Sequence, residues 1–558
     1  MKIICLGLCL IVVLTGCATS PDQKPMVEKT PGVPLGTLEI LRAEDSRNCH
    51  ALLQMAASLN FDRAFLAERL AIASGRIPCF QTWQLLAAQF GHHENVARAL
   101  AVAVRFPETQ FPGDKVLGTL LELPPSQAVA ETLMYLDTDA AFQAALGLKP
   151  YQRTVAKNLW RMKSRVNKEI LNLFFEKFPR ETVISLSRMK VEGFLSKEIL
   201  QRMPWQQRQI GCAVCLHAQD FLADPSWQVR IAALRKAQSG NAVRSLLNDP
   251  SALVRWEALR AMLRIDPHWQ PQDIDSLHPW EAETLAAAAH TPAETVKSLF
   301  AKGGVYAEIT APHMPEEAAQ AVLAEKLSHR ARIRYLEKCF GEERAVAEAK
   351  QLFQTHDSAY ALEYLLGRKS GIDRNALAAE ARLRDNFASV LADFGFLTPP
   401  IGESTPNRYA LALKEVEKYR GFRVHTGQGT MECRFFGEQA PLTCASFINL
   451  VKSGFFDGLV VHRVVPGFVT QDGDPSGSGS GGPGYTLRCE YNELKYDRAG
   501  RVGMALSGKD TGGSQYFITH APAPHLDHRY TVFAQVDKGL DVLSQLRQYD
   551  RVERIDLL

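Results

Sequence analysis

Two cysteines three residues apart, Cys212 and Cys215, have the spacing of a redox-active pair. In an oxidising compartment such a pair could alternate between thiols and a disulfide. The two residues between them are Ala and Val, and no strand-to-helix pattern surrounds them. Packing as structural thiols, or as a plain disulfide, is therefore the favoured interpretation. His217 follows Leu216 and does not directly follow Cys215, which excludes the Cys-x-x-Cys-His haem motif.

Histidines gather at two places where metal binding is conceivable. A pair at 92–93 precedes Glu94, which favours the solvated start of a helix. His520, His525 and His528 form a second group, for which positions on a rim or surface are favoured over a metal site. We expect no metal and no cofactor.

The composition excludes several classes of protein. A chain of 558 residues is too long for a single hydrophobic core. Its 46% apolar and 22% charged residues exclude wholesale disorder and fibrous architecture. The net charge of +3 lacks the clear basic excess that is typical of proteins that bind nucleic acid. Eleven cysteines are too few for a disulfide-built scaffold.

Residues 1–16 have the pattern of a targeting signal. Lys2 precedes an apolar run from 3 to 14, which is too short to cross a membrane. The following LTGC at 14–17 resembles the bacterial lipobox. That resemblance implies cleavage before Cys17 and lipidation of its sulfur, which would anchor the protein to a membrane. The alternative is an ordinary secretory signal in which this cysteine occurs by chance.

Residues 17–36 are polar and rich in proline, as expected of a flexible tether. The residue after the cysteine is Ala18 rather than an aspartate. By resemblance to Gram-negative sorting rules, this favours the outer membrane of the cell envelope, facing the periplasm.

Residues 37–397 have a helical pattern, with apolar residues recurring at intervals of three and four. A motif of Asp-Pro, then Val-Arg, then Ala-Leu begins at Asp224 and again at Asp249. Its Asp, Val and Ala positions each recur 25 residues later. Each Asp could cap a helix, with its Pro in the first turn. This motif resembles HEAT-type repeats and implies an α-helical solenoid; an irregular helical bundle is the alternative. Such an array could bind a protein partner in its groove or act only as a spacer.

Residues 398–418 form a linker with a short helix, and the pattern then changes to β. Alternating segments at 422–426 and 431–435 flank Gly-Gln-Gly and predict a hairpin. Glycine is dense in this region: six of the twelve residues from 473 to 484 are Gly. We expect short strands joined by Gly-rich turns over residues 419–558.

Seven sequence blocks in this region resemble the cyclophilin family of peptidyl-prolyl isomerases, in family order. They are FFDG (455–458), HRVVPGFV (462–469), QDGDP (471–475), GSGGPGY (479–485), VGMA (502–505), GGSQYFIT (512–519) and PHLD with YTVF (524–533). The resemblance covers about a quarter of the chain. It implies an all-β, closed eight-stranded antiparallel barrel capped by two helices. The whole chain is thus expected to be multidomain, an all-α HEAT-like solenoid followed by this barrel.

The resemblance also implies the site and its chemistry. Arg463 matches the catalytic arginine and Gln471 the glutamine that positions it. Residues expected to bind substrate are Phe468, Val469, Gly479, Ala505, Leu506, Gln515, Phe517, His525, Leu526 and Tyr530. Val469, Leu506, His525 and Tyr530 depart from residues frequent in the family, which bears on inhibition by cyclosporin more than on catalysis.

The sequence therefore predicts a peptidyl-prolyl cis-trans isomerase that acts on X–Pro bonds of exported proteins and assists their folding. Its partners are expected to be proline-containing polypeptide segments. Two alternatives stay open: a non-catalytic module that binds proline peptides, and a scaffold whose helical region carries the biological role. Pairing of Cys49 with Cys79 is left undecided by the sequence.

Overall fold

The structure is a computed structural model that describes residues 47–558 together with 40 and 43–44, except 60–63, 107–108, 110, 325–326, 357, 369–370, 384–389, 392–410 and 413. The predicted signal peptide, the tether with Cys17, and most of the predicted linker lie outside the described residues.

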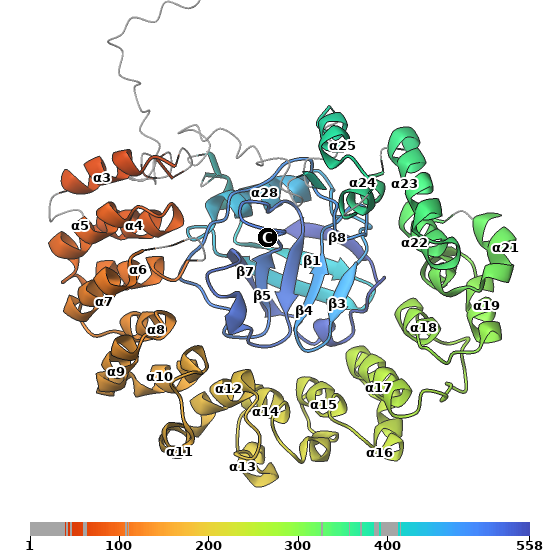
Figure 1. Ribbon diagram of the computed structural model, residues 1–558, viewed down its shortest axis with the longest axis horizontal. Coiled ribbons are helices and arrows are strands. Elements are labelled where there is room, and N and C mark those ends of the chain that lie inside the picture. The colour runs from red at the N-terminus through yellow and green to blue at the C-terminus, as the bar shows by residue number, and fades with distance from the viewer. Residues whose placement is uncertain are drawn as a thin grey trace, which may run out of the picture.

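Helices make up the chain from residue 49 to 381, as the periodicity predicts, and they form an arc (Figure 1). They are α3 (Cys49–Ala57), α4 (Ala64–Arg76), α5 (Phe80–Phe90), α6 (Glu94–Ala103), α7 (Gly113–Glu122), α8 (Gln127–Tyr135), α9 (Asp139–Gly147), α10 (Gln152–Asn158), α11 (Lys168–Lys177), α12 (Pro179–Met189), α13 (Lys197–Gln201), α14 (Trp205–Cys212), α15 (Trp227–Leu234), α16 (Gly240–Arg244), α17 (Ala252–Ile265), α18 (Pro279–Ala286), α19 (Ala293–Ala301), α20 (Gly304–Thr310), α21 (Ala319–Ala324), α22 (His329–Phe340), α23 (Glu342–His356), α24 (Ala359–Leu366) and α25 (Arg374–Ala381). In the part of the chain that the structure describes, none of the helices has the length and apolar character needed to cross a membrane.

Side-chain caps and buried faces explain why these short helices form. Ser126, Thr138 and Asn167 each accept a hydrogen bond from a backbone N–H in the first turn of the helix that follows. The apolar faces from Ile40 to Ala233 join into one continuous core. Because each helix buries its face against its neighbours, the array is held together by contacts between elements close in sequence.

The two related segments make equivalent contacts. Arg208 donates to both carboxylate oxygens of Asp224 at 2.7 and 2.8 Å, and Arg230 donates to both oxygens of Asp249 at the same distances. The aspartates do not cap the helices themselves, contrary to expectation, because α15 and α17 begin after Ser226 and Ser251. Each Asp instead accepts from the backbone N–H of that serine. The repeated motif thus links successive helical units through an Asp–Arg ladder.

The C-terminal region is an eight-stranded antiparallel sheet that curls on itself, in the order β3-β4-β6-β5-β7-β2-β1-β8. The strands are β1 (Gly421–Thr426), β2 (Gly429–Phe435), β3 (Arg463–Val465), β4 (Val469–Asp472), β5 (Arg501–Met504), β6 (Tyr516–Thr519), β7 (Val532–Lys538) and β8 (Val552–Leu557). The predicted hairpin is β1 with β2. The end strands β3 and β8 are not paired along their length, and one isolated bridge, Val460 with Arg551, joins the segments that lead into them. The sheet is therefore a curled half-barrel.

Helix α28 (Pro441–Lys452) covers the core of the curled sheet. Its Phe447 is fully buried and contacts Phe422, Phe456 and Phe533 at 4.6 to 5.4 Å between ring centroids. Ala412 and Val416, in a helical stretch before β1, belong to the same core. These contacts fix the sheet's curvature around one aromatic centre.

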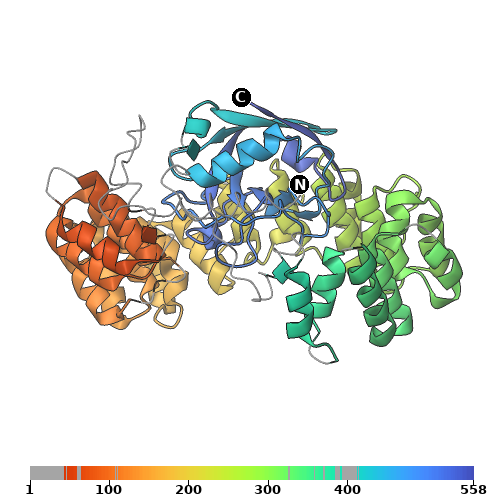
Figure 2. The same cartoon turned by 90° about the horizontal axis from the view of Figure 1, so that it is seen from above.

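The curled sheet lies inside the arc of helices, and helices flank it on both sides in either view (Figures 1 and 2). Apolar residues join the two regions: Cys489 and Tyr491 belong to the core of the first helices, and Val461 and Val464 to the core around α15 and α17. The helical region is thus packed around the sheet and is not a separate arm.

Among the cysteines, Cys49 and Cys79 form a disulfide that ties α3 to the start of α5, with their Cα atoms 5.4 Å apart. Cys212 and Cys215 are free and buried. Burial raises the pKa of Cys212 to about 12, so this thiol stays protonated and packs as a small apolar group. The interpretation of this pair as structural thiols agrees with these positions.

Candidate active site

Three polar side chains lie in a row across the sheet. Arg463 on β3 is directly opposite Gln471 on β4, and its Nη1 donates to Gln471 Oε1 at 3.2 Å. Gln471 Nε2 in turn donates to Gln515 Oε1 at 2.9 Å. Arg463 is exposed, and no carboxylate pairs with it among the residues that the structure describes. Its guanidinium is therefore oriented by an amide and keeps donors free for a ligand.

The Gly-rich loop that follows β4 is folded around one carboxylate. Asp474, 1% exposed, accepts hydrogen bonds from the backbone N–H groups of Ser476 and Gly479. Gly479 has φ +97°, and a Cβ at Gly481 would lie 1.9 Å from Asp474 Oδ1. The carbonyls of Gly479 and Gly481 then both accept from Gln515 Nε2 at 2.8 Å. The glycines of this dense stretch thus allow the loop to fold against Gln515 and support the polar row.

Next to this row lies an apolar cluster that is separate from the main core of the sheet. Val469, Phe517 and Leu526 are nearly fully buried in it. Phe468, Ala505 and Tyr530 pack against the cluster and are half-buried. Phe517 is directly opposite Gln471 on the neighbouring strand, so the aromatic ring and the polar row share one face of the sheet. The structure therefore brings the predicted pocket residues together.

Two residues that shape this pocket were not predicted. Tyr496 is fully buried beneath Phe517, with the ring centroids 5.5 Å apart. Gly503 is directly opposite Phe517, and a Cβ there would lie 2.4 Å from Phe517 Cζ and 2.1 Å from the Tyr496 hydroxyl. A glycine flanked by apolar residues in a strand is the signal that could have indicated such a close approach.

The rim of the pocket is shared with the helical region. His525, in a 3-10 turn (Pro524–Leu526), stacks on Phe468 with the ring centroids 5.2 Å apart. The Nη2 atom of Arg188, on α12, lies 2.7 Å from His525 Nδ1. Burial first, and then the charges of Arg188 and Arg529, lower the pKa of His525 to about 4. His525 is thus neutral at physiological pH and accepts a hydrogen bond from Arg188.

On the other side, Ala505, Leu506, Gln515 and the loop 479–482 line a small cavity of about 80 Å³. The backbone N–H of Ala505 donates to the carbonyl of Gln515 at 2.9 Å. Leu506 is half-buried against the main core. Together they line a groove beside the polar row, at residues that the sequence predicts to bind substrate.

The sequence favours rim or surface positions for all three histidines of the predicted group, but His520 and His528 are buried. His520 is fully buried, accepts from the Gly467 N–H at 3.1 Å and bonds the Thr470 hydroxyl at 2.8 Å. His528 is buried and bonds the Asn492 carbonyl at 3.2 Å. Among the residues that the structure describes, no three His, Cys, Asp or Glu side chains come together in a group that could hold a metal ion.

The site combines an exposed guanidinium held in place by amides, a buried apolar cluster beside it and a small groove along Ala505 and Gln515. Such an arrangement can bind an extended peptide and seat one apolar ring. It offers a hydrogen-bond donor next to that ring but no paired nucleophile and base. It is suited to a reaction in which charge distribution changes and no covalent bond is broken.

Comparison with known proteins agrees with this geometry. Residues 421–556 match the family model described as "Cyclophilin type peptidyl-prolyl cis-trans isomerase/CLD". A peptidyl-prolyl cis-trans isomerase of Synechococcus elongatus is 46% identical over 137 residues, 24% of this chain and 94% of the relative. The peptidyl-prolyl cis-trans isomerase B of Bacillus subtilis is 47% identical over 126 residues, 22% of this chain and 88% of the relative. A solved cyclophilin-type isomerase of Cryptosporidium parvum, crystallised with the dipeptide Ala-Pro, is 32% identical and covers 25% of this chain and 98% of its own, with a TM-score of 0.24.

The chain belongs to the cyclophilin-type peptidyl-prolyl cis-trans isomerase family through its C-terminal region. It is therefore an isomerase of X–Pro bonds, as the sequence predicts. The roles of individual site residues stay predictions.

Proposed function

We propose that the protein isomerises X–Pro bonds in polypeptides exported to the bacterial cell envelope and so assists their folding. The observation that supports this most directly is the Arg463–Gln471–Gln515 row beside the buried pocket of Val469, Phe517 and Leu526. The substrate class is extended, proline-containing segments; the related parasite structure with Ala-Pro is consistent with it.

The geometry suits the energetics of the reaction. Rotation about the X–Pro bond faces a barrier of about 18–20 kcal/mol because the amide C–N bond has partial double-bond character. As the bond twists, the prolyl nitrogen regains a lone pair that can accept a hydrogen bond. Arg463 can donate to that lone pair, which stabilises the twisted state more than either planar state. The apolar pocket holds the proline ring while the preceding carbonyl rotates.

We further propose that the helical array is of the HEAT type and that the curled sheet acts as a closed barrel. The Asp–Arg ladder of two related units supports the first proposal. The bridge between Val460 and Arg551 supports the second. An array of this type would present a surface for a protein partner.

Location at the envelope is part of the proposal. The lipobox-like segment before Cys17 supports anchoring by lipid, and Ala18 supports the outer membrane facing the periplasm. The Cys49–Cys79 disulfide supports the same view, because disulfides persist mainly in oxidising compartments.

The test is a protease-free measurement of isomerisation by NMR exchange on a short Ala-Pro peptide with the full chain. Arg463→Ala should reduce kcat/KM by about 100-fold or more, since one lost transition-state donor costs about 2.7–4 kcal/mol. Arg554→Ala, an exposed arginine of β8, is the matched control and should be unchanged. Equal rates for wild type and Arg463→Ala would refute the proposal.

Contact between the helical region and the rim of the site favours a second candidate, a scaffold that binds proline segments without needing turnover. The contact of Arg188 with the rim residue His525 is the observation behind it. A strain carrying only Arg463→Ala distinguishes the two. Loss of the cellular phenotype supports catalysis, whereas full complementation supports the scaffold.

A further inference from the structure

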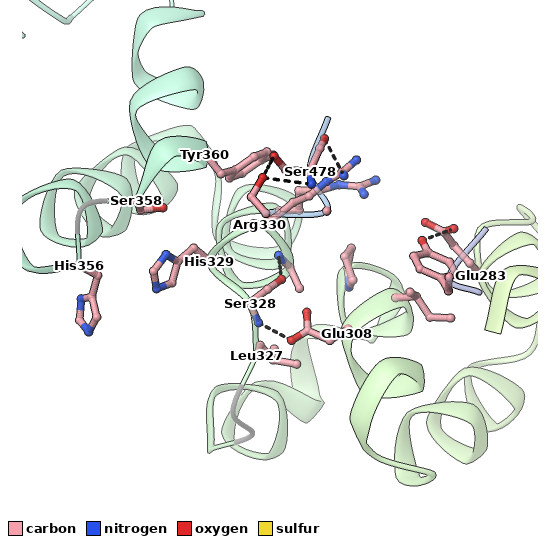
Figure 3. A pocket seen from close by; sticks show the side chains of 17 residues that line it. Glu283, Glu308, Leu327, Ser328, His329, Arg330, His356, Ser358, Tyr360 and Ser478 are labelled. Atoms are coloured by element: carbon pink, nitrogen blue, oxygen red, sulfur yellow. Dashed lines mark hydrogen bonds between the residues drawn. The ribbon is translucent and has the colours of Figure 1, made fainter. Parts of the chain in front are cut away.

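A second, larger cavity lies where the helical arc meets the Gly-rich loop of the sheet (Figure 3). Its volume is about 540 Å³, within the usual range of ligand-binding pockets. Helices α20, α22 and α24 form one side, and residues 476–478 form the other. The cavity therefore exists only because the two regions are packed together.

In the part of the chain that the structure describes, two arginines of the cavity have no carboxylate bound to them. Arg330 and Arg334 of α22 both line it, and neither forms an ion pair among the described residues. Of the two carboxylates that line it, Glu283 accepts from the Tyr549 hydroxyl at 2.7 Å and Glu308 from the backbone N–H of Ser328. The two carboxylates balance the formal charge of the arginines but bond other groups, so both guanidinium groups keep donors that can bind the carboxylate of a ligand.

The cavity is adjacent to the catalytic groove along one loop. Arg330 Nη1 donates to the carbonyl of Ser478 at 3.3 Å, and the next residue, Gly479, accepts from Gln515 of the polar row. Ser480 donates to Glu363 of α24. The loop 476–480 therefore borders both the cavity and the polar row, and an extended peptide, which advances about 3.3 Å per residue, can run along it from one to the other.

We propose that this cavity is a binding site for acidic side chains of the same polypeptide whose X–Pro bond occupies the catalytic groove. Arg330 and Arg334 select client segments that carry aspartate or glutamate a few residues from the proline, on the side of the groove bounded by Gly479 and Gln515. The helical region would then act as part of the enzyme's specificity site. This inference rests on the proposed isomerase function.

The test compares peptides with one central Ala-Pro bond in the NMR exchange assay with the full chain. One peptide is neutral, and the others carry a short run of Asp before the proline, of Asp after it, or of Lys in either place. Wild type should turn over one of the two Asp peptides with a KM roughly three- to tenfold lower than its Lys counterpart, since each exposed ion pair contributes a small factor. The preference should fade when the salt concentration rises from about 20 to about 300 mM.

Variants separate the cavity from the catalytic groove. Arg334→Ala, which removes a guanidinium without touching the loop, should lower the preference for the Asp peptide, and Arg334→Glu should reverse it. The double variant Arg330→Ala/Arg334→Ala should abolish it. Turnover of the neutral peptide should be unchanged in the two Arg334 variants, which leave the hydrogen bond between Arg330 and the loop in place. Arg344→Ala, an exposed arginine of α23 outside the cavity, is the matched control.

The outcomes for the two proposals are distinguishable. If the neutral peptide is not isomerised by wild type, the proposed function fails. If it is isomerised but Asp and Lys peptides are treated alike, or the double variant keeps the preference, the cavity is not a client site and this inference is overturned.

Discussion

At the residue scale, the pocket depends on a position that has no side chain. Gly503 lets the ring of Phe517 lie against its strand, with Tyr496 beneath. In Gly503→Ala the new methyl group would displace Phe517, and overpacking of this kind costs about 1–3 kcal/mol of stability. We expect kcat/KM to fall about ten- to hundredfold, because small misplacements of a binding group are costly.

The measurement is kcat/KM in the NMR exchange assay together with urea denaturation. Gly427→Ala provides the control, because the nearest atom to a Cβ there is Glu553 Oε1 at 3.9 Å. If Gly503→Ala retained full activity, Phe517 would not be fixed by this contact.

A second residue-scale prediction concerns the rim. Burial is the main cause of the low pKa of His525, and the charge of Arg188 adds to it. Arg188→Ala removes that charge, so the pKa of His525 should rise from about 4 toward its usual value of about 6.5. An NMR titration of the ring protons measures it. Arg180→Ala, exposed at the start of the same helix, should leave the titration unchanged.

At the element scale, the Asp–Arg ladder should stabilise the helical array. Arg230 and Asp249 are both buried, with side chains 13% and 4% exposed. Arg230→Ala would leave a buried carboxylate uncompensated, which costs about 3–5 kcal/mol. Hydrogen exchange should then speed up in α15 and α17 and much less in the strands of the sheet.

The comparison for this prediction is Arg153→Ala. Its partner is Glu181, and the arginine side chain is 76% exposed. An exposed pair of this kind contributes about 0–1 kcal/mol, so exchange should barely change. Equal effects of the two variants would show that burial of the ladder does not matter.

Local patterns explain which elements the sequence could predict. The β1–β2 hairpin follows from alternation around Gly-Gln-Gly, and the pocket residues follow from blocks of family sequence. Caps were less predictable: Asp224 and Asp249 have the residue type of a cap, but the serine two positions later takes that place. Serine and aspartate are both favoured at the N-cap position, so composition alone does not choose between them.

The packing of the helical array around the sheet could not be predicted. Its contacts join residues far apart in the chain, such as Arg188 with His525, 337 positions away, and Arg330 with Ser478, 148 positions away. Single arginines that meet a ring nitrogen or a backbone carbonyl leave no periodic signal in the sequence. For the same reason the cavity between the regions was not expected.

At the scale of the whole molecule, one buried charge cluster joins the array to the floor of the pocket. Glu131 of α8 bonds Arg105 and also Lys495, which precedes Tyr496. Burial alone would raise the pKa of Glu131, but attraction to Arg105 and Lys495 lowers it well below its usual range. The ionised carboxylate therefore stabilises the folded state above the unfolded-state pKa of about 4.3.

That contribution should be lost as pH falls below about 5, because the unfolded state then takes up protons that folded Glu131 does not. Glu131→Gln should lower the free energy of unfolding at pH 7 by about 3–5 kcal/mol. The loss should shrink as the pH is lowered. Urea denaturation at several pH values measures this, with exposed Glu122→Gln as the control. A pH-independent difference would contradict the assignment.

The whole molecule also has a predicted place in the cell, which depends on one sulfur atom. If Cys17 is lipidated, Cys17→Ala should abolish labelling by a palmitate analogue and move the protein from the membrane pellet to the soluble fraction. Two or more acyl chains are needed for stable anchoring, so loss of this attachment point should release the chain completely. Cys9 lies in the apolar run of residues 3–14, outside the lipobox-like segment, so Cys9→Ala should remain labelled and pelleted. Cys17→Ala that still carries the label would refute the anchor, whereas an unlabelled protein that still pellets would show that the helical array itself holds the isomerase at the membrane.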